Sequence, residues 1–278
     1  MRSGQRLATL ALLALAGRAS GTGMLVSPSQ MGMAAKPGET ASDVFRVSSS
    51  RTERTQVRVR VVDFDKGVDG VTFEANPPPA RSCASWTRIE PMAFETAETG
   101  WTQVRVAVSV PADARGTYWA LVVFQVDQAV AKTRGTTFVV RPQLEVPLLV
   151  TVEGTAEPAA RIENLKGLLR PDGTVEASAD VVNSGNTGSM PTGSWVVERR
   201  VGAATQAEEL AEKEMAGFLL LPGHTIRVRE VLAGAAAARG GSVRLYVRYG
   251  PDASQVAEAS APLDEEKPTS AKSLAPSR

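Results

Sequence analysis

The chain has 278 residues, 43% of them hydrophobic, and 31 Lys and Arg against 30 Asp and Glu, which gives a formal net charge of +1. This composition is that of a folded globular protein, and the length suits two domains. A nearly neutral chain without a long basic cluster lacks the charge pattern of a nucleic-acid-binding protein. With a single His (His224) and a single Cys (Cys83), the chain lacks the ligands for a zinc site rich in His or Cys. A Ser–His or Cys–His mechanism would have to use His224, and neither a calcium-binding loop nor an isolated pair of carboxylates stands out. We therefore expect a non-catalytic protein without a metal or a cofactor; the alternative, an enzyme, would need an acidic pair or a constellation around His224.

Residues 1–21 have the features of a secretory signal peptide. Arg2 and Arg6 precede an apolar run at 7–16, and small residues follow at 17–21. The run is shorter than the roughly 20 residues that cross a bilayer, so we expect no membrane span. The sequence predicts an exported protein of the periplasm or the cell surface. One Cys cannot form an internal disulfide there, and we expect Cys83 to be buried and inert.

Residues 22–150 predict a first domain of short strands. Val57, Val59 and Val61 alternate with arginines, as in a strand with one buried face. The run 118–126 is apolar on both faces, so we expect a central strand with Trp119 between two sheets. A loop is expected at 127–135.

The run 136–150 alternates most clearly. Six of its apolar residues, Phe138, Val140, Leu144, Val146, Leu148 and Val150, fall on even positions, with Thr137, Arg141, Gln143 and Glu145 between them. Pro142 and Pro147 cannot donate ladder hydrogen bonds, so we expect one long strand with an unpaired edge or two strands in tandem. This apolar stripe either faces the domain's own core or is exposed to a partner.

Residues 151–262 predict a second domain of strands. The segment 207–216 contains good helix formers and is expected to be a short surface helix or a polar loop. The last strand is expected at 243–249, and the tail 263–278 is expected to be disordered. The predicted fold is all-β, with two immunoglobulin-like antiparallel β-sandwich domains in tandem.

Several motifs follow the order found in exported two-domain immunoglobulin-like proteins. They are Val26-Ser27-Pro28, Trp86-Thr87-Arg88-Ile89-Glu90-Pro91, Gly116-Thr117-Tyr118-Trp119, Val182-Asn183-Ser184-Gly185-Asn186 and Leu220-Leu221-Pro222-Gly223. In this order the chain resembles two families. One is the PapD-type periplasmic chaperones of pilus assembly, and the other is the WxL-interacting-type surface proteins of cell walls.

The chaperone resemblance implies a protein partner such as a pilus-like subunit, bound without catalysis. Those chaperones complete an unfinished subunit by lending it an alternating strand. The residues that would perform this are Phe138, Val140, Leu144, Val146 and Leu148. The wall-protein resemblance implies instead a surface or adhesion protein that binds a wall component or a partner protein.

The chain departs from the chaperone family in its cationic anchor. The family holds the subunit's terminal carboxylate with an Arg on the first strand and a Lys on the last strand of the first domain. Here the first strand carries Ser27, Ser29 and Gln30, and the late position is near Glu145. Arg141 or Lys36 would have to substitute.

The remaining candidates have structural interpretations. His224 follows Pro222-Gly223 and is expected in a solvated turn without an adjacent carboxylate. We expect the tryptophans in the cores, with Trp101 the most exposed. The loop 183–188 is expected to be a turn whose Gly and Asn residues take positive φ, or else a binding loop.

Overall fold

The computed structural model describes residues 24–49, 54–67, 70–97, 100–126, 129–133, 136–199, 207–250 and 252–266, with the backbone alone at 70–73, 129–133 and 136–140. The predicted signal peptide lies outside these residues. Apart from one 3-10 turn, η1 (Ala84–Trp86), all regular elements of the described residues are strands. No helix in this part of the chain has the length and apolar character needed to cross a membrane. The predicted all-β class is confirmed.

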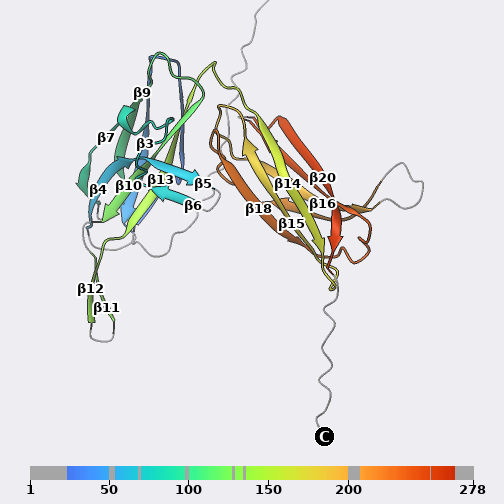
Figure 1. Ribbon diagram of the computed structural model, residues 1–278. Coiled ribbons are helices and arrows are strands. Elements are labelled where there is room, and N and C mark those ends of the chain that lie inside the picture. The colour runs from blue at the N-terminus through green and yellow to red at the C-terminus, as the bar shows by residue number, and fades with distance from the viewer. Residues whose placement is uncertain are drawn as a thin grey trace, which may run out of the picture. The chain divides into compact units, whose positions relative to one another are not determined.

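The strands follow one another along the chain in two groups (Figure 1). The first group is β1 (Met24–Ser27), β2 (Met31–Ala35), β3 (Thr40–Ser49), β4 (Gln56–Val62), β5 (Phe64–Gly67), β6 (Gly70–Phe73), β7 (Thr87–Glu90), β8 (Ala93–Glu95), β9 (Thr102–Ser109), β10 (Thr117–Val126), β11 (Ala129–Thr133), β12 (Thr136–Val140) and β13 (Gln143–Val152). The second group is β14 (Ala160–Leu169), β15 (Val175–Asn183), β16 (Thr192–Arg199), β17 (Glu208–Met215), β18 (Thr225–Leu232), β19 (Ser242–Tyr249) and β20 (Gln255–Glu265).

The first unit is a sandwich of a four-stranded sheet, β1-β3-β9-β7, and a five-stranded sheet, β2-β13-β10-β4-β8. Phe45 on β3 and Phe124 on β10 meet edge to face, with ring centroids 5.3 Å apart, so side chains of both sheets share one core. As predicted, β10 is central, and Trp119 is buried at 2% exposure, with its indole N–H donating to Phe64 O at 3.0 Å. Val57 and Val59 are buried while Arg58 and Arg60 are exposed, as the alternation predicted.

The second unit is one seven-stranded sheet in the order β17-β16-β19-β20-β14-β15-β18. Neighbours are antiparallel except β14 and β20, which pair in parallel through Gly167 and Leu263. The sheet curls around a core that includes Trp195, Leu220, Leu245 and Val181. Its two edge strands meet where Lys213 Nζ on β17 donates to Glu230 Oε1 at 2.7 Å and to Val231 O at 3.3 Å on β18.

The two units also include segments that are far apart in the sequence. The second unit contains the chain from residue 151 onward. It also contains Asp65–Thr72 and Ala114–Thr117. The predicted fold, two immunoglobulin-like sandwiches, is confirmed, since each unit encloses its own core between sheet layers.

Three predicted segments are corrected. Within the segment 207–216, residues 208–215 form strand β17 and not a helix or a loop, because they pair with β16. The strand at 242–249 is not the last, since β20 follows it and runs to Glu265. The start of the tail predicted at 263 was wrong, because Leu263 is buried at 9% exposure and Glu266 N–H donates to Leu169 O at 3.0 Å.

Candidate partner-binding site

The first unit carries a two-stranded arm, made of β11 and β12. Their register pairs Ala131 with Phe138 and Ala129 with Val140, antiparallel. Neither strand has another strand beside it among the described residues. Figure 1 shows the arm continuing from β10 and β13 and projecting away from the other strands of this unit. In an antiparallel pair, alternate N–H and C=O groups of each strand point away from the partner, so both outer edges of the arm present main-chain donors and acceptors.

The base of the arm is fixed by the sandwich. Just before β11, Val126 on β10 pairs with Val57 on β4, and Val126 N–H donates to Pro142 O at 2.9 Å. Pro142 lies between β12 and β13, where a residue without an N–H interrupts the ladder. The run 136–150 is therefore two strands in tandem, one of the two arrangements predicted.

The loop predicted at 127–135 was wrong over most of its length, since β11 occupies residues 129–133. A signal for this hairpin was present in the sequence. Only two residues, Arg134 and Gly135, separate Thr133 from Thr136, and β-branched residues on either side of a two-residue interval with Gly favour a hairpin.

The apolar stripe has two parts, one in the arm and one in the sandwich, which meet at the base of the arm. Val146 and Leu148 are buried, at 3% and 0% exposure, in the core of the first sandwich. They cannot fill a partner's groove while that sandwich is intact, so the predicted donor set is corrected at these two positions. Leu144 is half-buried and Arg141 is exposed at the base of the arm. The backbone of Phe138 and Val140 lies in the arm, and their side chains lie outside the described residues.

The candidate cationic anchors lie on different strands or turns. Lys36 follows β2 and pairs with Glu39 at 3.9 Å, with its side chain 67% exposed. Arg141 precedes β13, where Gln143 Nε2 donates to Glu145 Oε1 at 2.7 Å. An exposed Lys–Glu pair of this kind contributes little to stability, so Lys36 stays accessible to an anionic group.

His224 differs from its prediction. Its side chain is only 15% exposed, and its Nε2 lies 2.5 Å from Asp65 Oδ1. Its Nδ1 lies 2.9 Å from Pro222 O, so both ring nitrogens have an oxygen within hydrogen-bond distance. A general base needs a free nitrogen aimed at the proton that it removes, and His224 is arranged instead as a structural link. Its carboxylate partner comes from 159 residues away, and no local sequence signal could have found it.

A second contact of the segment Asp65–Thr72 lies beside this link. Lys66 Nζ donates to Leu219 O at 3.0 Å, and burial lowers the pKa of Lys66 from its usual value. In the described part of the chain, no group of three or more His, Cys, Asp and Glu side chains is arranged to hold a metal ion.

The other candidate side chains serve mainly in packing. Trp119 and Trp195 are buried, while Trp101 is 50% exposed, as predicted. Trp86 is half-buried and not in the core, and its ring centroid lies 4.4 Å from that of Tyr118. Burial raises the pKa of the Cys83 thiol to about 12, in agreement with the predicted inert cysteine.

The loop 183–188 is a structural turn, but for a different reason than predicted. None of its residues is among the described ones with positive φ. Instead, a Cβ on Gly185 would lie 2.5 Å from Ala159 N and closer still to Glu157 O, so only Gly fits. Asn183 Nδ2 donates to Thr187 O at 2.9 Å and Asn186 Nδ2 to Thr155 O at 3.0 Å, which ties the loop down.

Comparison with known proteins gives structural likeness only. No family model matches the chain, and no curated protein matches it. Among solved structures it is similar to the class 5 fimbriae chaperone CfaA, at 10% identity and a TM-score of 0.47, over 85% of this chain and 98% of that one. It is also similar to a chain of the CsuC–CsuE pre-assembly complex, a chaperone with a tip subunit from the archaic chaperone-usher Csu pili of Acinetobacter baumannii, at 10% identity and a TM-score of 0.45, over 88% and 99% of the two chains. The E. coli chaperone DraB matches at 12% identity and a TM-score of 0.37, over 86% of this chain and 97% of its own.

Proposed function

We propose that this chain is an exported, non-catalytic protein-binding module of cell-envelope or pilus assembly that acts as a chaperone by β-strand addition. The observation that supports this function is the arm β11–β12, which the first sandwich holds at its base and whose outer edges have no strand neighbour within the described residues. An exposed strand edge is a template for pairing with another chain.

Part of the apolar stripe is buried in the sandwich and part lies in the arm, and this supports a specific way of binding. Buried residues of β13, such as Leu148, hold this strand in the sandwich, and Val126 N–H donates to Pro142 O at the base of the arm. Main-chain hydrogen bonds along the arm would give affinity, and alternate side chains would give specificity. The partner-binding residues on this proposal are Phe138 and Val140 in the arm, with Arg141 and Leu144 at its base. The partner is a protein such as a pilus-like subunit.

The test is capture of a partner by the arm. The tagged chain would be incubated with an envelope extract of the source organism, and captured proteins would be identified by mass spectrometry. The variant Phe138→Glu/Val140→Glu places two charges in the arm. A matched control, Met190→Glu/Val256→Glu, places the same charges at apolar residues that are 49% and 52% exposed in the second unit.

We expect the wild type and the control to capture the same pilus-like subunit, and the arm variant to lose it with an unchanged melting temperature. Retention of the subunit by the arm variant would overturn the proposal. A large drop in its melting temperature would do so as well, because the arm would then be part of the sandwich core.

A further inference from the structure

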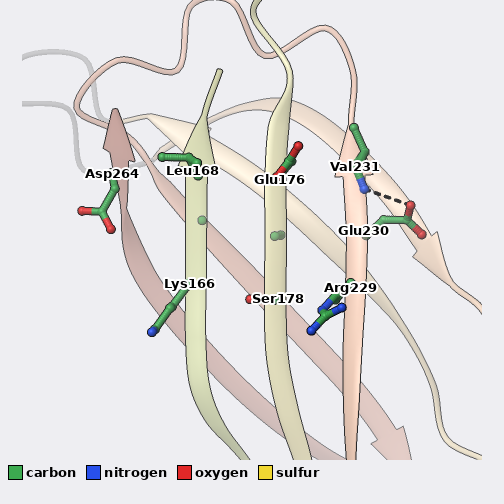
Figure 2. A pocket seen from close by; sticks show the side chains of 10 residues that line it. Lys166, Leu168, Glu176, Ser178, Arg229, Glu230, Val231 and Asp264 are labelled. Carbon is green, nitrogen blue, oxygen red and sulfur yellow. Dashed lines mark hydrogen bonds between the residues drawn. The ribbon is translucent and has the colours of Figure 1, made fainter. Parts of the chain in front are cut away.

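The outer face of the second sheet has a hollow of about 550 Å³ over β14, β15 and β18, with the end of β20 at its side (Figure 2). The pairing register arranges its side chains in rows across the strands. One row is Lys166, Ser178 and Arg229, because Lys166 pairs with Ser178 and Ser178 with Arg229. The next row is Leu168, Glu176 and Val231. The hollow lies entirely within the second unit.

The first row carries two cations, of which Arg229 acts through its charge on Asp180 and helps to lower the pKa of that carboxyl. Lys166 and Arg229 are exposed and, within the part of the chain that the structure describes, neither forms an ion pair. Figure 2 shows them on the two strands that flank Ser178, with the guanidinium of Arg229 on the side of β18 that faces β15. The ammonium of Lys166 points the other way, but its flexible four-carbon chain allows it to turn toward an anion. Together with the hydroxyl of Ser178, the row offers an anion two cations and a hydroxyl donor.

The nearby acids do not neutralise this row, because three of the four have partners of their own. Asp180 accepts two hydrogen bonds from Arg227, at 2.7 and 2.9 Å. Glu176 is paired with Arg170 at 2.8 Å. Glu230 is paired with Lys213 and also accepts from Val231 N–H at 2.9 Å, drawn as a dashed line in Figure 2. Asp264 lies outside the cationic row, at the end of β20 beside Leu168.

The second row of side chains adds an apolar surface to the hollow. Leu168 is half-buried and Val231 is 50% exposed, on either side of Glu176. Neighbouring rows on one face are two residues apart along a strand, or roughly 6.6 Å. That distance also separates side chains i and i+2 of an extended peptide, so an occupant could place an acid over the first row and an apolar group over the second.

We propose that this hollow is a docking site for an extended acidic segment of a partner protein, with a carboxylate between Lys166 and Arg229 and, two residues away, an apolar side chain against Leu168 and Val231. The segments 1–23 and 267–278 do not match this occupant, because they contain no Asp or Glu and carry Arg2, Arg6, Arg18, Lys267, Lys272 and Arg278. A free inorganic anion would use only the first row. The site is independent of the arm and does not rest on the proposed chaperone function.

The test uses the full chain labelled with ¹⁵N and short synthetic peptides followed by NMR. The probe is acetyl-Thr-Glu-Thr-Val-Thr-amide, compared with the same peptide carrying Gln for Glu and with one carrying Ser for Val. We expect saturable shifts of the Lys166, Ser178 and Arg229 amides at millimolar peptide, and binding at least about tenfold weaker without the carboxylate. The Ser peptide should bind more weakly than the probe.

Variants of the protein distinguish binding of the peptide at this hollow from its non-specific attraction to positive charge. Lys166→Ala/Arg229→Ala should lose the shifts, and the matched variant Arg105→Ala/Arg248→Ala, which removes two exposed cations elsewhere, should keep them. The proposal is overturned if the Gln peptide binds as well as the probe, if the first variant still binds, or if no shift appears at these residues. It is also overturned if inorganic phosphate binds as tightly as the probe, or if light scattering shows a dimer that the first variant abolishes, because the occupant would then be a free anion or a second copy.

Discussion

The carboxylate of Asp180 lies 2.7 and 2.9 Å from Nε and Nη2 of Arg227, in a fork across β15 and β18. The Asp180 side chain is 6% exposed, and Asn164 Nδ2 donates to it at 2.8 Å. We expect Arg227→Ala to lower the free energy of unfolding by about 2 kcal/mol, because it leaves a buried carboxylate without its cation. Urea denaturation measures the change. Arg229→Ala, on the same strand and without this contact, should change it by less than about 0.5 kcal/mol, and equal losses in both variants would contradict the assignment.

The same pair predicts how stability depends on acid. The hydrogen bonds from Arg227, with Asn164 and nearby positive charge, hold the pKa of Asp180 below its usual value. A carboxyl group whose native pKa is lowered contributes stability that is complete above its unfolded pKa, about 3.9, and is lost as the pH falls through its native pKa. We expect Asp180→Asn to be less stable than wild type at pH 7 and to approach it below about pH 4. Parallel dependence of the two proteins on pH between 7 and 3 would contradict this.

The buried part of β13 predicts a large effect on stability. Leu148 is fully buried, so Leu148→Ala should lower the free energy of unfolding by about 2–5 kcal/mol through lost apolar contact and a cavity. Thermal and urea unfolding measure it. As a control, Val256→Ala at a residue that is 52% exposed should have little effect. If Leu148→Ala were as mild as this control, Leu148 would not anchor the base of the arm.

The loop after β15 predicts a steric effect. Gly185→Ala would bring a Cβ against the backbone of residues 157–159, and we expect it to lower the free energy of unfolding by about 1–3 kcal/mol. Gly217→Ala is the matched control, because a Cβ there meets only Pro191 O at 3.8 Å. Unfolding curves of the two variants give the comparison. Equal stability would show that the loop can move away at no cost.

The burial of Cys83 predicts a thiol that is protected from reagents in solution. It is fully buried, and its pKa is raised to about 12, so at pH 8 almost none of it is the reactive thiolate. We expect a disulfide reagent to label the native chain only as fast as it unfolds and to label it at once in denaturant. Rapid labelling of the folded chain would mean that Cys83 is accessible.

The sequence predicted best those strands whose side chains alternate strictly. The alternation at β4 indicates directly which face is buried, since Val57 and Val59 are buried while Arg58 and Arg60 are exposed. Strand β17 was missed because its sequence, Glu-Glu-Leu-Ala-Glu-Lys-Glu-Met, consists of good helix formers. Its strand conformation is imposed by pairing with β16, and intrinsic propensity does not report such a neighbour.

The candidate site was predictable in part. The alternation of 138–150 predicted strand structure, which β12 and β13 have, but alternation is the same for a strand that faces its own core and for one that faces a partner. Only the structure separates Val146 and Leu148, which are buried, from Arg141, which is exposed. The contact of His224 with Asp65 and the cationic row of Lys166 and Arg229 depend on which distant strands and turns meet, and local patterns contain no such information.

The contact of Lys213 with Val231 bears on how the chain behaves at high concentration. A seven-stranded sheet has two edge strands, here β17 and β18, on which other molecules could add strand by strand into aggregates. The ammonium of Lys213 donates a hydrogen bond to the carbonyl of Val231 and so places a charge between the two edge strands. A lysine at a sheet edge opposes the addition of further strands. The second unit thereby resists aggregation at its edges.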